Sequence, residues 1–179
     1  MSAGHHPPGL PDNEYHTLTD WLAFCRDHPL VMEWLQRPRR IDRNHHIPYL
    51  GGISKDGAVV FLDCRYDSIM ECHEHHHALD TADTIPDHEI TEYVCVRFYG
   101  MNYEDKNLFR NPHIWGNTAE WLAVLALNCE WDPYNKFIDS QLKAIEDAPV
   151  TRCPPTLATY PYQGDPVLLK KIKAAQQET

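Results

Sequence analysis

Residues 88–92 of this chain read His-Glu-Ile-Thr-Glu, a pattern whose residue types and spacing could bind a metal ion and use it. If the segment is helical, His88 and Glu92 stand on one face, because residues four apart lie one above the other. Both side chains could then bind one zinc ion. Glu89 would point to an adjacent sector of the helix, where it could accept a proton from a water molecule that zinc activates. We therefore predict metal ligands at His88 and Glu92 and a general base at Glu89.

A third ligand must come from another part of the chain. His113 opens the next long predicted helix and is well placed for this role. Glu120 lies seven residues later, about two turns along the same helix face, and could be a fourth ligand or could orient a ligand histidine. The predicted site therefore comprises His88, Glu92, His113 and Glu120, with one zinc ion (Zn2+) per chain. The alternative is an ordinary His-Glu pair on an amphipathic helix.

A histidine-rich segment at residues 71–77 offers a second candidate metal site. Its residues 73–77 match the pattern His-Glu-x-x-His formally, but no amphipathic helix pattern surrounds them. If the segment is a strand, His73, His75 and His77 share one face and could bind metal. We favour a solvent-facing histidine cluster with adventitious affinity and keep this segment as a backup site.

The helix that carries the first motif should span residues 84–100. Thr84 followed by Asp87 resembles a capping box, and Pro86 is tolerated in the first helical turn. Gly100 is placed to end the helix, because glycine adopts the left-handed conformation that often follows a last turn. The spacing of Glu89 and the two ligands is therefore expected to be helical.

Upstream of this helix, a β-hairpin is predicted. The short apolar runs 47–50 and 58–62 flank Asp56-Gly57, and Asp-Gly between such runs is a strong hairpin signal. The basic run at residues 37–40, with Arg43, is more typical of a solvated loop than of a binding patch. Residues 64–83 read as a third strand or a loop. A helical pattern begins at Thr17, with Leu18, Trp21, Leu22 and Cys25 on one face. Further helices are predicted at residues 30–36, 103–110, 117–128, 133–146 and 165–177.

Three regions are predicted along the 179 residues. Residues 1–14 should form an extended N-terminal arm, and residues 15–147 a single α+β domain. Residues 148–179 should form an extended C-terminal tail that wanders over a surface and ends in a short helix. Because such segments are seldom ordered alone, protein partners or homo-oligomer contacts are expected through both tails.

The composition disfavours several classes of function. A formal charge of −10 at pH 7 argues against a surface that binds nucleic acid. No apolar run approaches the roughly 18 residues that a membrane span needs. The N-terminus lacks the apolar stretch of a secretion signal, so a cytoplasmic location is expected. The 6 cysteines are scattered with no Cys-x-x-Cys pair, which indicates reduced thiols.

The hairpin region carries a motif of its own. Residues 48–57 read Pro-Tyr-Leu-Gly-Gly-Ile-Ser-Lys-Asp-Gly. This segment resembles the P-Y-L-x-G-x-S-x-D-G hairpin of an uncharacterised family of bacterial and phage proteins. Members of that family follow the hairpin with H-E-x-x-E, then G-x-x-Y, then H-x-x-A-x-x-x-E, and end near a tyrosine. The resemblance covers about residues 45–142 of this chain.

The later family elements are present here with some departures. The H-E-x-x-E element corresponds to residues 88–92, and G-x-x-Y corresponds to Gly100 to Tyr103. The later histidine and glutamate correspond to His113 and Glu120, and the final tyrosine to Tyr134. The spacing from Tyr103 to His113 is longer than expected, which implies an insertion around residues 106–112. Positions 116 and 117 hold Gly and Asn, where the family pattern suggests small apolar residues.

The order of hairpin and motif-bearing helix also resembles the minimal zincin metallopeptidase arrangement. That resemblance implies an α+β fold in which a small β-hairpin or sheet packs on a bundle of about four to five helices. It implies a zinc-dependent hydrolase with a peptide or protein substrate. Tyr103 or Tyr93 could stabilise an oxyanion in it; the alternative, which we favour for both tyrosines, is ordinary core packing. The alternative is a non-catalytic structural component of a phage particle or other assembly that retains the fold. Its location would then be the virion rather than the cytoplasm of a bacterial host.

Overall fold

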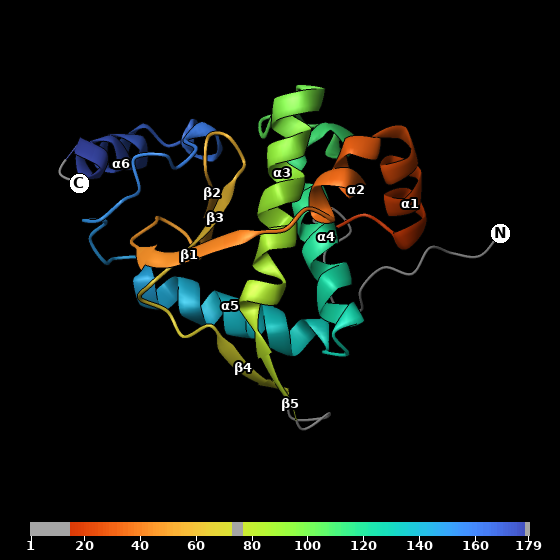
Figure 1. The fold of residues 1–179 in the computed structure, drawn as a ribbon, viewed down its shortest axis with the longest axis horizontal. Helices are drawn as coiled ribbons and strands as arrows, with labels where there is room; N and C mark the ends of the chain where they lie inside the picture. The colour runs from red at the N-terminus through yellow and green to blue at the C-terminus, as the bar shows by residue number, and fades with distance from the viewer. Residues whose placement is uncertain (1–14, 73–76, 178–179) are drawn as a thin grey trace. The chain divides into compact units, whose positions relative to one another are not determined.

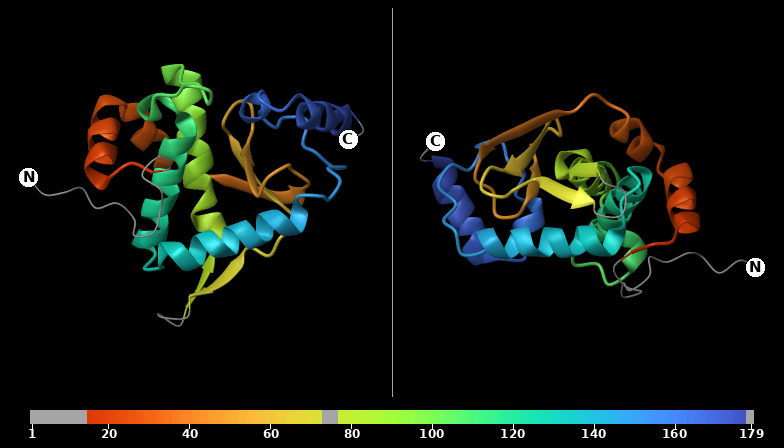
Figure 2. Two further views of the ribbon diagram at one scale, coloured as in Figure 1. Left: turned by 180° about the vertical axis from the view of Figure 1, so that it is seen from behind. Right: turned by 90° about the horizontal axis from the view of Figure 1, so that it is seen from below.

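The computed structural model describes residues 15–72 and 77–177 (Figures 1 and 2). These residues form six α-helices, three 3-10 helices and two small sheets, which confirms the predicted mixed α+β class. The chain divides into two compact units, Met1–Pro38 with Asp83–Asp132 (unit 1) and Arg39–Ala82 with Pro133–Thr179 (unit 2). The predicted domain at residues 15–147 stays a prediction, and the predicted arm at residues 1–14 lies outside the described residues.

Unit 1 is helical. Its four α-helices are α1 (Leu18–Asp27), α2 (Pro29–Leu35), α3 (Ile85–Tyr99) and α4 (Pro112–Ala126). The short helix predicted at residues 103–110 is only the 3-10 helix η2 (Leu108–Arg110). Helices α3 and α4 lie side by side in every ribbon view, and they are in contact along their lengths (Figures 1 and 2).

The apolar face predicted for the first helix differs from the one that α1 buries. Trp21 and Phe24 are buried, whereas Leu18 and Leu22 are 46% and 62% exposed. The reason is aromatic packing: the Phe24 ring stacks on Trp115 of α4 with their centroids 3.8 Å apart. Since each residue turns a helix by about 100°, burying Trp21 and Phe24 rotates the leucine pair toward solvent.

Helix α3 begins and ends close to the predicted positions. Pro86 lies in its first turn, and Gly100 follows its last residue with φ +65°, a conformation that glycine adopts without steric cost. The predicted capping box is not formed as such. The Thr84 side chain makes no capping hydrogen bond, and the Asp87 N–H instead donates to the Thr84 carbonyl at 2.9 Å.

Unit 2 contains both sheets. Strands β1 (Arg40–His45), β2 (Gly51–Ile53) and β3 (Val59–Asp63) form one sheet in the order β1-β3-β2, with β1 parallel and β2 antiparallel to β3. Strands β4 (Ile69–Cys72) and β5 (His77–Asp80) form an antiparallel pair. Helix α5 (Trp131–Ile145) begins with the last two residues of unit 1 and continues in unit 2, which ends with α6 (Pro166–Gln177).

The predicted hairpin exists, but its first strand is displaced. β2 occupies residues 51–53 rather than 47–50, and the turn carries Gly57 at φ +74°. The prediction that the basic segment at residues 37–40, with Arg43, forms a loop is also partly wrong, since Arg40 and Arg43 lie in β1. Charged residues suit this position because β1 is an edge strand, and Arg43 forms an ion pair with Asp80 at 2.7 Å.

The C-terminal segment before α6 does not wander over a surface. Cys153, Leu157 and Tyr162 belong to a buried cluster with Ile47 and Phe61 of the sheet region. An isolated β-bridge joins residues 54 and 157, and this contact extends the sheet edge at β2. Residues 148–164 therefore supply part of the core of unit 2.

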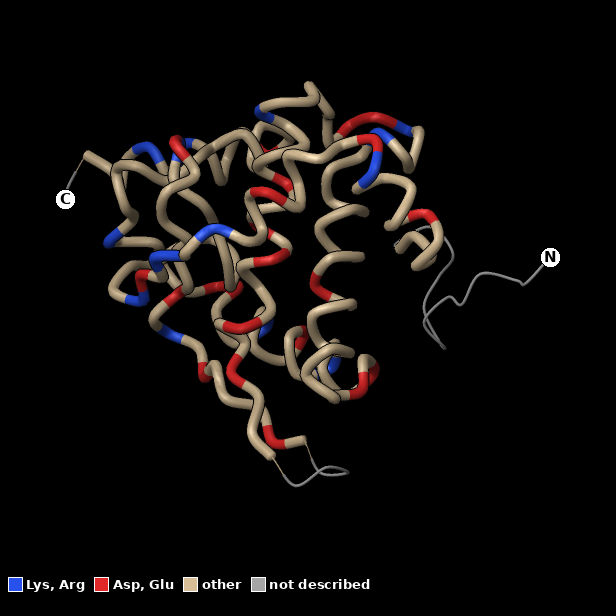
Figure 3. The backbone as a smooth tube through the Cα atoms, turned by 45° about the vertical axis from the view of Figure 1, so that its right-hand side comes forward, with Lys and Arg blue, Asp and Glu red and all other residues tan. Residues whose placement is uncertain are grey.

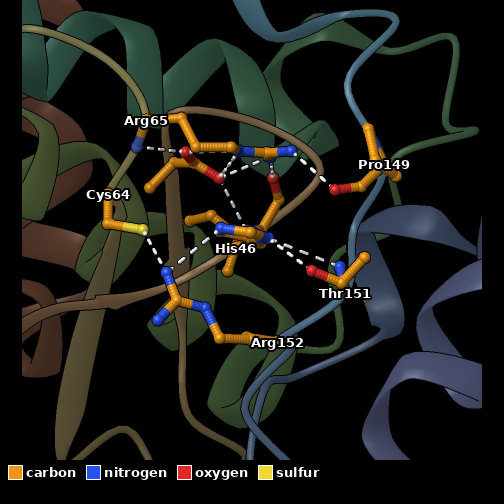
Figure 4. A network of polar contacts seen from close by, with 8 residues as sticks. His46, Cys64, Arg65, Pro149, Thr151 and Arg152 are labelled. Carbon is orange, nitrogen blue, oxygen red and sulfur yellow. Dashed lines mark hydrogen bonds and ion pairs between the residues drawn. The ribbon is translucent and has the colours of Figure 1, made fainter.

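A polar network holds the start of that segment (Figure 4). The Arg65 guanidinium pairs with the fully buried Asp63 carboxylate at 2.6 Å. It also donates to the carbonyl oxygens of Ile47 and Pro149, both at 2.9 Å. His46 contacts Thr151 through Nδ1 at 3.0 Å. One buried ion pair thus joins β3, the loop after β1 and the C-terminal segment.

Acidic residues and the lengths of the helices can be compared with what the composition predicts. Asp and Glu positions recur along the backbone of both units (Figure 3). Among the described residues, no helix is both long and apolar enough to cross a membrane.

Candidate metal centre

Two helices of unit 1 position the predicted ligands. His88 and Glu92 lie one turn apart on α3, as the four-residue spacing predicts. His113 lies in the first turn of α4, where its N–H donates to the side chain of Asn111 at 2.9 Å. Asn111 is therefore the N-cap that fixes the start of α4 and the position of His113.

The three side chains converge. Oε1 of Glu92 lies 3.0 Å from Nε2 of His88 and 2.8 Å from Nδ1 of His113. One potential ligand atom from each residue lies within 4.8 Å of the others. Such a group could hold a metal ion, although nothing in its geometry identifies which metal.

Glu120 lies on the other side of the His88 ring. Its Oε2 is 3.0 Å from Nδ1 of His88, the nitrogen that does not face Glu92. A carboxylate in this position accepts the ring N–H and fixes the orientation and tautomer of the imidazole. Of the two roles that the sequence left open for Glu120, the geometry favours the orienting one over a fourth ligand.

Gly116 provides the space in which the two helices approach. A Cβ atom at this position would lie 2.9 Å from Cγ of Glu92 and 3.1 Å from Nε2 of His88. Because Gly116 has no side chain, the side chains of His88 and Glu92 on α3 can pack directly against the backbone of α4.

The group is buried on one side and open on the other. The side chains of Glu92 and His88 are 5% and 13% exposed, whereas that of His113 is 53% exposed. His113 is therefore the member of the group that faces solvent.

The charges of this buried group are strongly coupled. Burial acts to lower the pKa of His88, but the Glu92 and Glu120 carboxylates outweigh it and hold that pKa well above its usual range. Burial acts to raise the pKa of Glu92, but His88 and His113 hold it well below its usual range. Both shifts favour the charged forms, a protonated imidazole between two carboxylates.

Glu89, the predicted general base, is half-buried beside this group. Burial raises the pKa of its carboxyl group to about 8, the negative charge of Glu92 adds to the rise, and His88 opposes it. A carboxyl group whose pKa lies near neutrality can exchange protons under physiological conditions, which suits acid–base catalysis.

Tyr103 has a role that the sequence did not suggest. Its hydroxyl donates to Oε2 of Glu92 at 2.6 Å. Tyr93, the other tyrosine considered for an oxyanion, is buried and packs on Trp34 and Phe98. The only signal for Tyr103 in the sequence was the Gly-x-x-Tyr element at residues 100–103, which follows the helix motif.

The backup site at residues 73–77 falls mostly outside the described residues. His77 lies at the start of β5, whereas His73 and His75 are among the residues that the structure does not describe. That site stays a prediction. In the described part of the chain, His88, Glu92 and His113 form the one cluster with metal-binding potential.

Comparisons of the chain with protein-family models, with curated proteins and with solved structures gave no match. The resemblance to the bacterial and phage family therefore rests on its motifs alone.

Proposed function

We propose that this chain is a zinc-dependent hydrolase of the metallopeptidase type. The observation that carries the proposal is the convergence of His88, Glu92 and His113 from two helices, with one potential ligand atom of each within 4.8 Å of the others. Two imidazoles and one carboxylate are a ligand set that zinc peptidases use. Each chain would bind one ion.

The spacing of two pairs of ligand atoms is compatible with zinc. Around a tetrahedral zinc ion with bonds of about 2.0–2.1 Å, neighbouring ligand atoms lie about 3.3 Å apart. The two separations from Oε1 of Glu92 to the imidazole nitrogens are 3.0 and 2.8 Å. Each of these two separations would therefore need to widen by only about half an ångström or less for both of its atoms to bind one ion.

The number of ligands favours a catalytic over a structural ion. Structural zinc sites are closed by four protein ligands, whereas catalytic sites have three and an open position. Among the described residues the cluster has three members, and one of them, His113, is exposed to solvent. Glu120 contacts Nδ1 of His88, on the opposite side of the ring from Glu92, and so orients this ligand.

A bound zinc ion supplies Lewis acidity, which polarises a carbonyl group and lowers the pKa of water. Glu89 acts as the general base: its carboxylate accepts the proton of the attacking water and passes it to the departing amine. Glu120 accepts the N–H of His88 and holds that ring in place. The substrate class, a peptide or protein, follows the zincin resemblance.

A second candidate is a non-catalytic protein of an assembly such as a phage particle. The observation that favours it is that both ring nitrogens of His88 lie 3.0 Å from a carboxylate oxygen, at hydrogen-bonding distance. The cluster would then be a charge network that stabilises α3 against α4. Contacts with partners or other copies would use the terminal segments.

The metal content of the purified protein tests the proposal. We expect about one zinc per chain, and His88→Ala should lose most of it, because removal of a ligand opens the site. His45→Ala is the matched control, since His45 pairs with Asp42 in unit 2. Iron and manganese should be measured in the same samples, because two histidines and one carboxylate also suit iron. Protein without a bound ion, or equal zinc in His88→Ala and the unaltered chain, would refute the proposed site.

A further inference from the structure

The two oxygens of the Glu92 carboxylate have separate tasks. Oε1 faces the imidazoles of His88 and His113, at 3.0 and 2.8 Å. Oε2 accepts the hydroxyl hydrogen of Tyr103 at 2.6 Å. Because the carboxylate is almost fully buried, few other donors can reach Oε2, and the Tyr103 contact decides how the group is turned.

Tyr103 is held by the loop between α3 and α4. The loop starts at Gly100, and Met101 bonds back to the Cys95 carbonyl, so the chain turns sharply after α3. Asn111, the N-cap of α4, donates its side-chain N–H to the Tyr103 carbonyl at 3.1 Å. The same residue therefore fixes both Tyr103 and His113.

The far part of the loop is anchored to the helical core. The indole N–H of Trp115 donates to the Phe109 carbonyl at 3.2 Å. Nε2 of the buried His16 lies 3.3 Å from the Leu108 carbonyl. Residues 108 and 109, in the middle of the stretch 106–112 that the sequence marks as an insertion, are thus held by two side chains of unit 1. The loop that carries Tyr103 is therefore anchored on both sides of that residue, at Met101 and at residues 108–109.

We infer that Tyr103 is a positioning residue of the proposed zinc site, where its hydroxyl turns Glu92 so that Oε1 alone faces the ion. This inference rests on the proposed function. A carboxylate held in this way binds through one oxygen and leaves a coordination position free. Without the hydroxyl, the second oxygen is able to swing toward the ion and occupy that position. Tyr103 is thereby assigned to the metal site and not to an oxyanion.

The test compares Tyr103→Phe with Tyr99→Phe. The control also removes one tyrosine hydroxyl from unit 1, but the Tyr99 hydroxyl accepts from the Leu30 N–H at 3.2 Å and does not touch the ligands. Zinc affinity, measured by competition with a chromophoric chelator, should fall about 10–100-fold in Tyr103→Phe and stay within about twofold in the control.

The visible absorption spectrum of bound cobalt(II) reports the coordination geometry of the ion. A general loss of protein stability would not change that spectrum. With Co2+ in place of zinc, Tyr103→Phe should show a weaker visible absorption band, because a second oxygen of Glu92 raises the coordination number. The unaltered chain and Tyr99→Phe should share one spectrum. A second readout needs no variant: in the zinc-loaded chain, nuclear magnetic resonance should detect a slowly exchanging hydroxyl proton that is assigned to Tyr103.

The failures are distinguishable. If the unaltered chain binds no zinc, the proposed function fails and the role of Tyr103 with it. If the unaltered chain binds zinc, but Tyr103→Phe matches it in affinity and in cobalt spectrum, only the inference about Tyr103 is overturned. If Tyr103→Phe does not fold, absence of a protected Tyr103 hydroxyl proton in the zinc-loaded unaltered chain overturns the inference.

Discussion

His88 has a defined partner on each of its ring nitrogens, and this decides what the residue can do. Glu120 accepts from Nδ1, so Nε2 is the nitrogen that faces Glu92. A ring fixed in this way presents the Nε2 lone pair to an ion without losing rotational freedom on binding. The sequence predicted that the two residues would be neighbours through the four-residue spacing, but it did not predict which nitrogen each carboxylate would take.

Removing the support from His88 should weaken zinc binding without abolishing it. Glu120→Ala is expected to lower zinc affinity about 10–100-fold, as loss of an outer partner of a ligand histidine usually does. The measurement is competition with a chelator at constant pH and ionic strength. Glu104→Ala removes the same charge from an exposed position in unit 1 and should leave the affinity unchanged. An equal loss in both variants would mean that only net charge matters.

Glu89 separates metal binding from catalysis. Glu89→Gln keeps the size of the side chain but cannot accept a proton, so we expect full zinc content and hydrolysis slowed by about 10²–10⁴-fold. Cleavage of a mixture of unstructured peptides, followed by mass spectrometry, measures the rate. Zinc content checks that the site is intact. Undiminished cleavage in this variant would remove Glu89 from the mechanism.

Helix α3 was predictable because its signals are local. Pro86 in the first turn and Gly100 after the last residue mark its ends, and both act through the backbone of the helix itself. Strand β1 was not predictable in this way. Its residues 40–45 read Arg-Ile-Asp-Arg-Asn-His, which lack strand alternation, and they form a strand only because β3 pairs with them.

The displaced hairpin strand has a similar cause. Gly51 and Gly52 read as turn residues, yet they pair with Leu62 and Phe61 in β2. A Cβ at position 52 would lie 2.8 Å from Cδ1 of Leu157, so the glycine serves a close approach between segments about one hundred residues apart. No local sequence pattern predicts the contact between Gly52 and Leu157.

At the candidate site, Gly116 likewise allows a close approach, here between helices α3 and α4. This contact can be tested by substituting the glycine. Alanine normally stabilises a helix interior relative to glycine by about 1 kcal/mol. Here its Cβ would press on Glu92 and His88, so Gly116→Ala should lower zinc affinity despite the gain in helix propensity. Gly116→Val should lower it further and should also lower the melting temperature.

Gly164→Ala is the control for that experiment, because a Cβ there meets nothing within 4 Å. Chelator competition and thermal unfolding of the metal-free chains are the measurements. A Gly116→Ala protein that gains stability and keeps full zinc affinity would contradict the close helix packing at the site.

The C-terminal segment illustrates what sequence patterns leave out for the whole chain. Its Pro- and Thr-rich composition indicates an extended tail, but Leu157 is fully buried and pairs with the edge of a sheet formed much earlier in the chain. Burial of this kind depends on contacts distant in sequence. The candidate site was easier to predict, because most of it lies on two helices with strong local signals.

Zinc should protect the two units unequally. An ion that binds only the folded state stabilises it by about 2.7 kcal/mol at one hundred times its Kd. All proposed ligands lie in unit 1, so hydrogen exchange of amides in α3 and α4 should slow on adding zinc. Amides of β3 in unit 2 are expected to change less. Slowing confined to unit 2 would place the ion elsewhere, for example at residues 73–77.

The most direct test of the zinc site is anomalous X-ray scattering at the zinc absorption edge, recorded from crystals of the zinc-loaded protein. We predict one strong peak per chain about 2.0–2.1 Å from Nε2 of His88, Oε1 of Glu92 and Nδ1 of His113. Glu120 should remain on Nδ1 of His88 and stay unbound to the ion. A peak bound only by other residues, or no peak in zinc-loaded crystals, would contradict the assignment of this cluster as a metal centre.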